Sequence, residues 1–308
     1  MWDTNPRKVL VGVEDSDCEA ALRYAAAEAL RRGCGVHLVH VAGPGAREDV
    51  VLLEGELRQL GEAVLAEAAH RTEHLLLECV KDDEPPPVST EVTHGTVVAS
   101  LESLSARACL VVLQHHGMGP TGETPTVSVT SGVAARADSP VVAVPAGWRP
   151  TSPSGAVVAG VDVAAPSVPL VEAALQEAAR QGARLRLVHA WLPEGDESRV
   201  TNDEHRSLLE RRLVDIVAEA HPIAPAVEVE VVLEPGPIGH VLREQAAGAD
   251  LVVVGRHRRR TIGGPLGRTV RELLRWSQAP VLVVGPAQPG GSRPRARAAD
   301  AGRLIGPS

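Results

Sequence analysis

The clearest pattern of apolar and polar positions lies between residues 251 and 284. Leu251–Val254 is a continuous apolar run, typical of a parallel strand buried on both faces, and Gly255 ends it. Thr269–Trp276 has apolar residues at helical spacing, and Val281–Val284 is a second apolar run. The segment predicts a strand, a glycine-bearing loop, a helix and a further strand. The free N–H groups at the start of that helix form a candidate anion site.

Similar patterns run through the first half of the chain. The segments that predict strands are Lys8–Val13, Val36–Val41, Val88–Thr93, Cys109–Leu113 and Val141–Val144. The segments that predict helices are Ser16–Arg32, Glu48–Arg71, His94–Ala106 and Ser128–Ala137. Ser16 and Glu19 have the spacing of a capping box, which predicts that the first helix begins there.

The pattern then repeats. VLVGVE at 9–14 recurs as VVAGVD at 157–162, and five such ordered matches have offsets of 140 to 149. Each copy alternates strands and helices, so the sequence predicts an α/β fold of two tandem doubly wound domains, each a five-stranded parallel sheet with helices on both faces. We place these domains at 1–147 and 155–285, with a Pro- and Ser-rich linker at 148–154 and a disordered tail at 286–308.

Composition narrows the function classes. The net charge of −8 divides into −9 for residues 1–150 and +1 for residues 151–308, so neither half has the basic balance of a nucleic-acid-binding protein. Cys18, Cys34, Cys79 and Cys109 lack the spacing of a metal site and are expected to be free thiols. The chain shows no signal peptide and no membrane-spanning run, so we expect a cytoplasmic protein without a membrane partner.

Several of these segments together resemble one family. VGVEDS with GVHLVHV resembles the first half of a universal stress protein domain, and ADLVVVGRH with GRTVRELL and APVLVV resembles its second half. The resemblance covers about residues 7–145 and 155–285. It implies the adenine-nucleotide-hydrolase-like fold, pairing of two domains through their last strands within the chain, and a homodimer as a further option. It also implies ATP binding, with Mg²⁺, in those members that keep a glycine loop after the fourth strand.

The family's loop has a Gly, two residues, a second Gly, nine residues, and then Gly-Ser or Gly-Thr. In the second copy Gly255 fits the first position, but Arg258 replaces the second glycine. Gly267 fits the third only if the loop is one residue shorter, with Arg268 then at the hydroxyl position and Thr269 beside it. Arg256, His257 and the arginines that follow are a candidate phosphate clamp, since their charge would replace lost backbone contacts.

The first copy departs from the loop differently. Gln114 replaces the first glycine and Val127 the third, whereas Gly117 and Ser128 fit the second glycine and the hydroxyl position. A side chain at a glycine position blocks the approach of backbone N–H groups to phosphate, so the second copy is the favoured site. The resemblance also places an acidic residue near the adenosine. The candidate binding residues at the strand ends are therefore Val161, Asp162 and Ala190 in the second copy and Val13, Glu14 and Val41 in the first.

Other candidates have simpler interpretations. His115 and His116 lack an obvious third metal ligand, and we interpret them as solvated loop residues. His40 and His189 end the second strand of each copy, where packing or a backbone hydrogen bond is sufficient to explain them. The sequence contains no Ser-His-Asp spacing, HExxH motif or carboxylate pair that predicts catalysis.

The leading hypothesis is a nucleotide (ATP)-responsive regulator of the universal stress type that is not a metabolic enzyme and acts on an unidentified protein partner. Two alternatives stay open. A scaffold of the same fold that binds no nucleotide is favoured by the two degenerate loops, and a slow ATPase would need a catalytic base that the sequence does not reveal.

Overall fold

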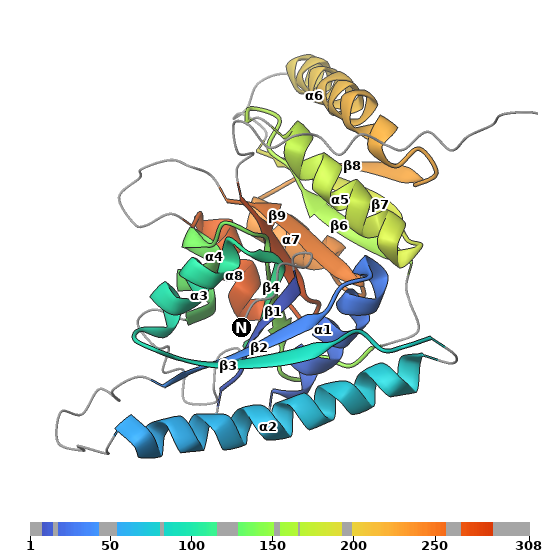
Figure 1. The fold of residues 1–308 in the computed structure, drawn as a ribbon. Helices are drawn as coiled ribbons and strands as arrows, with labels where there is room; N and C mark the ends of the chain where they lie inside the picture. The colour runs from blue at the N-terminus through green and yellow to red at the C-terminus, as the bar shows by residue number, and fades with distance from the viewer. Residues whose placement is uncertain are drawn as a thin grey trace, which may run out of the picture.

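The computed structural model describes residues 8–14, 18–42, 54–80, 83–115, 129–150, 155–165, 167–192, 199–256 and 266–285. These residues form one sheet of ten strands in the order β3-β2-β1-β4-β5-β10-β9-β6-β7-β8 (Figure 1). The strands of the first half are β1 (Lys8–Gly12), β2 (Val36–Ala42), β3 (Val88–His94), β4 (Ala108–His115) and β5 (Val141–Pro145). Those of the second half are β6 (Ala156–Gly160), β7 (Arg184–Trp191), β8 (Val229–Pro235), β9 (Leu251–Gly255) and β10 (Val281–Val284).

All strand pairs within each half are parallel, and the halves meet through one antiparallel pair. Leu282 of β10 lies opposite Val142 of β5, with regular pairs on either side. Both strands are almost completely buried, as their apolar sequences predict. The pairing of the last strands, which the sequence resemblance implied, is therefore confirmed, and it joins the two halves into a single sheet.

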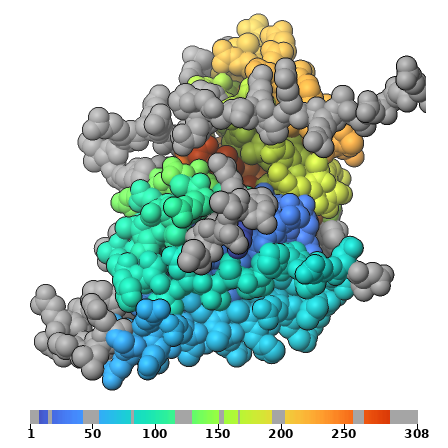
Figure 2. Space-filling view, in the orientation of Figure 1, coloured from blue at the N-terminus to red at the C-terminus, as the bar shows by residue number. Residues whose placement is uncertain are grey.

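Helices cover both faces of the sheet. The helices are α1 (Glu19–Arg32), α2 (Glu54–Cys79), α3 (Val97–Ser105), α4 (Val129–Arg136), α5 (Val168–Gln181), α6 (Arg199–Ala220), α7 (Ile238–Gln245) and α8 (Arg268–Trp276), with a 3₁₀ turn at His221–Ile223. Helices α1, α2, α5 and α6 pack on one apolar core that runs through both halves, and α3, α4, α7 and α8 pack on the other face. Figure 2 shows α2 and α6 at opposite ends of the molecule.

Polar contacts also join the halves on the α1 and α5 face. Arg32 at the end of α1 donates from Nη2 to Glu177 of α5 at 2.7 Å and from Nε to Glu28 at 2.8 Å. Both carboxylates are buried, so each depends on such partners to offset its lost hydration. Nearby, Tyr24 and Trp148 make an edge-to-face contact with ring centroids 5.5 Å apart.

The first helix begins later than the predicted start at Ser16, a residue that lies outside the described ranges. The helix begins at Glu19, with Cys18 at the N-cap and no side-chain capping bond from that residue. Part of the cap comes instead from the end of β4, where the Gln114 amide oxygen accepts from the Ala21 N–H at 3.3 Å. Helix α2 also continues to Cys79, beyond the predicted end at Arg71. None of the helices in the described ranges is long and apolar enough to cross a membrane.

Candidate functional site

The larger candidate site is a cavity of about 620 Å³ in the second half. It lies at the carboxyl ends of β6, β7 and β9, where the strand order reverses and open α/β sheets hold ligands. The first turns of α5, α7 and α8 and the end of β10 complete its wall. The lining residues are Gly160, Val161, Asp162, Ser167, Pro169, Leu170, His189, Ala190, Ile238, Leu242, Val254, Gly255, Arg256, Gly267, Thr269, Val270, Val284 and Gly285.

Hydrogen bonds fix the β6–α5 turn at the rim of this cavity. His189 donates from Nδ1 to the Val161 carbonyl at 2.9 Å, which sets the tautomer because a carbonyl oxygen only accepts. The Ala164 N–H donates to one carboxylate oxygen of Asp162 at 2.9 Å, and the Ser167 hydroxyl donates to the Asp162 carbonyl at 2.6 Å. The exposed carboxylate of Asp162 is therefore held beside the cavity by a turn that its own side chain helps to form.

Glycines keep the floor and one wall of the cavity open. A Cβ at Gly160 would lie 2.8 Å from a methyl carbon of Leu242, so the crossing of β6 and α7 requires a glycine there. Gly267 is the N-cap of α8, and its missing side chain leaves open space, with no heavy atom of the described residues within 4 Å of the Cβ position. The first N–H groups of α8 thus begin at the cavity wall, where the positive end of the helix dipole favours an anion.

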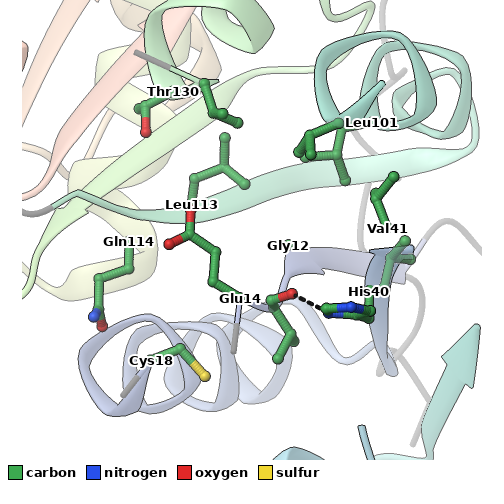
Figure 3. A pocket seen from close by; sticks show the side chains of 13 residues that line it. Gly12, Glu14, Cys18, His40, Val41, Leu101, Leu113, Gln114 and Thr130 are labelled. Carbon is green, nitrogen blue, oxygen red and sulfur yellow. Dashed lines mark hydrogen bonds between the residues drawn. The ribbon is translucent and has the colours of Figure 1, made fainter. Parts of the chain in front are cut away.

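The first half contains the equivalent cavity, but it is much smaller, at about 170 Å³. Figure 3 shows Gly12 and Glu14 at the end of β1, His40 and Val41 on β2, and Leu113 and Gln114 on β4 around it. The dashed line in that view joins His40 to the backbone of Val13, since His40 Nδ1 donates to the Val13 carbonyl at 3.0 Å. Of the two explanations that the sequence left open for His40 and His189, both histidines make the backbone hydrogen bond, and each lies two residues before the end of its strand.

Larger side chains explain the smaller cavity. Among the lining positions that the strand registers make equivalent, four differ in residue type: Glu14 and Asp162, Val41 and Ala190, Leu113 and Val254, and Gln114 and Gly255. In every pair the first-half residue is the larger one, so each substitution takes volume from the cavity.

At the Gln114 position the two halves differ in which element carries the large side chain, the strand end or the facing helix. Gln114 packs against the start of α1, where Ala21 is small. In the second half the equivalent residues are Gly255 and Leu170, and a Cβ at Gly255 would lie 3.6 Å from a methyl carbon of Leu170. The larger side chain of the pair is therefore on the strand in the first half and on the helix in the second. This leaves the end of β9 open.

Arg256 lines the second cavity, but its guanidinium group contacts the first half of the chain. Nη1 donates to the Ala134 carbonyl at 3.2 Å and Nη2 donates to the Ala137 carbonyl, so the side chain binds the C-terminal end of α4 in the first half. Burial lowers the pKa of Arg256, and the nearby carboxylates of Asp138 and Glu102 oppose that shift. The phosphate-clamp role of Arg256 stays a prediction, and in this structure the cation binds carbonyl groups across the interface.

The other predicted site residues divide into three groups. Val161, Asp162, Ala190, Gly255, Gly267 and Thr269 line the second cavity, and Val13, Glu14 and Val41 line the first. Arg268 does not line the cavity, since its side chain is 89% exposed and bonds to Glu272 at 2.7 Å. Gly117, Ser128 and His257, and with them His116, Val127 and Arg258–Arg260, lie outside the described residues.

The sequence interpretation missed the helical part of the wall. Pro169 and Leu170 enter from the first turn of α5, and Ile238 and Leu242 from one face of α7. The spacing of Ile238 and Leu242 by four residues was a usable signal, because it places both on the same side of a helix. Across the described ranges, no group of three or more His, Cys, Asp or Glu side chains is arranged to hold a metal ion.

Comparisons with known proteins agree with this architecture. The family model described as "Universal stress protein family" matches residues 5–145 and again 155–285. A universal stress protein of Mycobacterium tuberculosis is 32% identical over 301 residues, which is 89% of this chain and 94% of that protein. A solved universal stress protein from Archaeoglobus fulgidus shares the fold, with a TM-score of 0.66 and 18% identity over 90% of this chain and 98% of the other. Another solved universal stress protein, in complex with cAMP, matches 44% of this chain and 98% of its own, with 28% identity and a TM-score of 0.36.

Proposed function

Because the chain belongs to the universal stress protein family along both halves, we propose that it is a regulator that responds to an adenine nucleotide bound in the second cavity. ATP with Mg²⁺ is the first candidate, and the protein acts by binding and not by turnover. The observation that carries the proposal is the open end of β9 at Gly255 beside the N-terminus of α8, which together leave a cavity of about 620 Å³ at the reversal of strand order.

The lining divides into regions that suit the parts of a nucleotide. Pro169, Leu170 and Ala190 supply apolar surface for a base, and Asp162 supplies a carboxylate at the rim for ribose hydroxyls. The N-terminal end of α8, with Gly267 and Thr269, supplies N–H groups and a hydroxyl for phosphate. The first cavity, at about 170 Å³, is below the usual size of a site for such a ligand, so one nucleotide per chain is expected.

The regulatory step follows from where this cavity lies. The end of β9 lines it, and the next residue, Arg256, binds the C-terminal end of α4 in the other half. Occupancy favours one arrangement of this strand end and its interface over others, and so changes the surface offered to a protein partner.

Calorimetric titration with ATP, ADP, AMP and cAMP, each with and without Mg²⁺, tests the proposal. The Gly267→Val variant should lose at least about tenfold in affinity because the new side chain occupies the space in front of the α8 N-terminus. It should fold normally, since its Cβ would meet no atom within 4 Å in the part of the chain that the structure describes.

Gly147→Val is the matched control, because Gly147 is exposed, lies outside both cavities and also has open space at its Cβ position. Equal affinity in the two variants would place the site elsewhere. Failure of the unchanged protein to bind any of the four nucleotides would favour the scaffold, and steady release of phosphate from ATP would favour the ATPase.

A further inference from the structure

Two thiols meet in the first half, at the end of the sheet opposite the cavities. Cys34 lies just after the C-terminal end of α1 and before β2, and Cys109 is the second residue of β4. Their sulfur atoms are 3.7 Å apart although the residues are 75 positions apart in the chain. Both lie at the amino ends of their strands, whereas the cavities lie at the carboxyl ends, so neither thiol lines a cavity.

The surroundings separate the pKa values of the two thiols. A hydrogen bond from Cys109 and the positive charge of Arg32 lower the pKa of Cys34 to about 7, against the opposing effect of burial. The same hydrogen bond and burial raise the pKa of Cys109, so this residue keeps its proton. A thiolate is the nucleophilic form of cysteine, and a neighbouring thiol is the arrangement that resolves an oxidised sulfur.

Access also differs between the cysteines. Cys34 is 8% exposed, and Cys109 beside it is partly exposed, so the Cys109 side is the more open side of the pair. Cys79 at the end of α2 is exposed, and Cys18 is buried at the first cavity. The Cys34 and Cys109 pair is therefore distinct from both remaining cysteines in its geometry.

We propose that Cys34 and Cys109 are a reactive dithiol that a hydroperoxide oxidises to an intramolecular disulfide. In the first step the Cys34 thiolate attacks a peroxide oxygen and the O–O bond breaks. Cys34 becomes a sulfenic acid, and the leaving oxygen takes a proton from solvent to form an alcohol, or water from hydrogen peroxide.

In the second step the Cys109 sulfur attacks the sulfur of Cys34, and the S–O bond breaks. The hydroxide that leaves takes the Cys109 proton as water, so the two sulfurs supply the two electrons that reduce the peroxide. The sulfurs must close from 3.7 Å to a bond of about 2.05 Å. The product ties the start of β2 to the start of β4 across β1, and an external dithiol reverses it by exchange.

The test uses the full chain, reduced and then treated with one equivalent of hydrogen peroxide or of an organic hydroperoxide. After remaining thiols are alkylated, non-reducing peptide mapping should show a Cys34–Cys109 linkage, and the intact mass should fall by two hydrogens. Dithiothreitol should restore both thiols. A dimer linked through Cys79, or oxidation of Cys79 while the pair stays reduced, would overturn the proposal.

Three variants separate the roles of the two sulfurs. In Cys109→Ser, Cys34 has no resolving thiol and should accumulate as a sulfenic acid that a dimedone-type reagent labels. In Cys34→Ser, Cys109 should stay a thiol, and Cys79→Ser should form the disulfide as the unchanged protein does. Absence of a labelled Cys34 in a folded Cys109→Ser protein would contradict the order of steps. If that variant does not fold, the map of the Cys79→Ser protein still decides whether the linkage forms.

Discussion

His37 is a titratable side chain held almost fully inside the sheet. It is 1% exposed, its Nδ1 lies 2.9 Å from the Ser89 hydroxyl, and its Nε2 lies 3.2 Å from the Glu91 carboxylate. Burial lowers the pKa of His37, although Glu91 acts in the opposite direction. The imidazole is therefore held as a neutral group that donates through one nitrogen and accepts through the other.

This shift predicts a specific dependence of stability on pH. The unfolded chain takes up a proton at His37 near pH 6.5, whereas the folded protein does so only at lower pH. Unfolding in that window takes up a proton, so the free energy of unfolding should fall as the pH is lowered from 7 to 5.

Urea denaturation at a series of pH values measures this effect. The slope should become shallower in His37→Gln, while His74→Gln, which removes an exposed histidine of α2, should keep it. The same slope in all three proteins would show that other groups cause the acid sensitivity.

At the scale of elements, the contact between Gln114 of β4 and Ala21 of α1 predicts that substitutions at these two positions have coupled effects on stability. Gln114→Gly removes the amide that caps α1 and should lower the free energy of unfolding by about 1 kcal/mol. Adding Ala21→Leu copies the second half, where Leu170 packs beside Gly255, and should recover part of that loss. A double-mutant cycle by urea denaturation measures the coupling. Additive effects would contradict the coupling, and Ala21→Leu alone should destabilise by overpacking.

Element types and order were predictable because apolar periodicity is a local signal. The runs at Leu251–Val254 and Val281–Val284 predicted β9 and β10 almost to the residue. The start of α1 was not predictable, since its cap comes from Gln114, which is 93 residues away in the chain. The candidate site shows the same division. Residues in the strand-end motifs, such as Asp162 and Gly267, were found, whereas the wall from Leu170 and Leu242 depends on how helices pack.

At the scale of the whole molecule, one continuous sheet joins two similar halves that differ in charge. Pairing of β5 with β10 removes an exposed edge from each half and makes the last strands the centre of the molecule. Side-chain contacts that reinforce this interface include Arg32 with Glu177 and Arg256 with α4. The sequence repeat does not reveal them, because Gln181 and His115 occupy the positions equivalent to Arg32 and Arg256.

Arg256 gives the sharpest test of this interface. Its guanidinium binds two carbonyl groups at the end of α4, where the negative end of the helix dipole favours a cation, and it covers Gly285 beside β10. Arg256→Ala leaves these partly buried carbonyls without their partner and should lower the free energy of unfolding by about 2 kcal/mol. Arg268→Ala is the matched control, since that arginine is 89% exposed and bonds to Glu272 on the surface of its own helix, so its loss should leave the free energy of unfolding nearly unchanged. Urea denaturation compares the two variants, and ATP titration of the same proteins provides the second measurement. A fall in ATP affinity in Arg256→Ala with unchanged stability would instead identify Arg256 as a phosphate ligand, with its contact to α4 of no consequence for the interface.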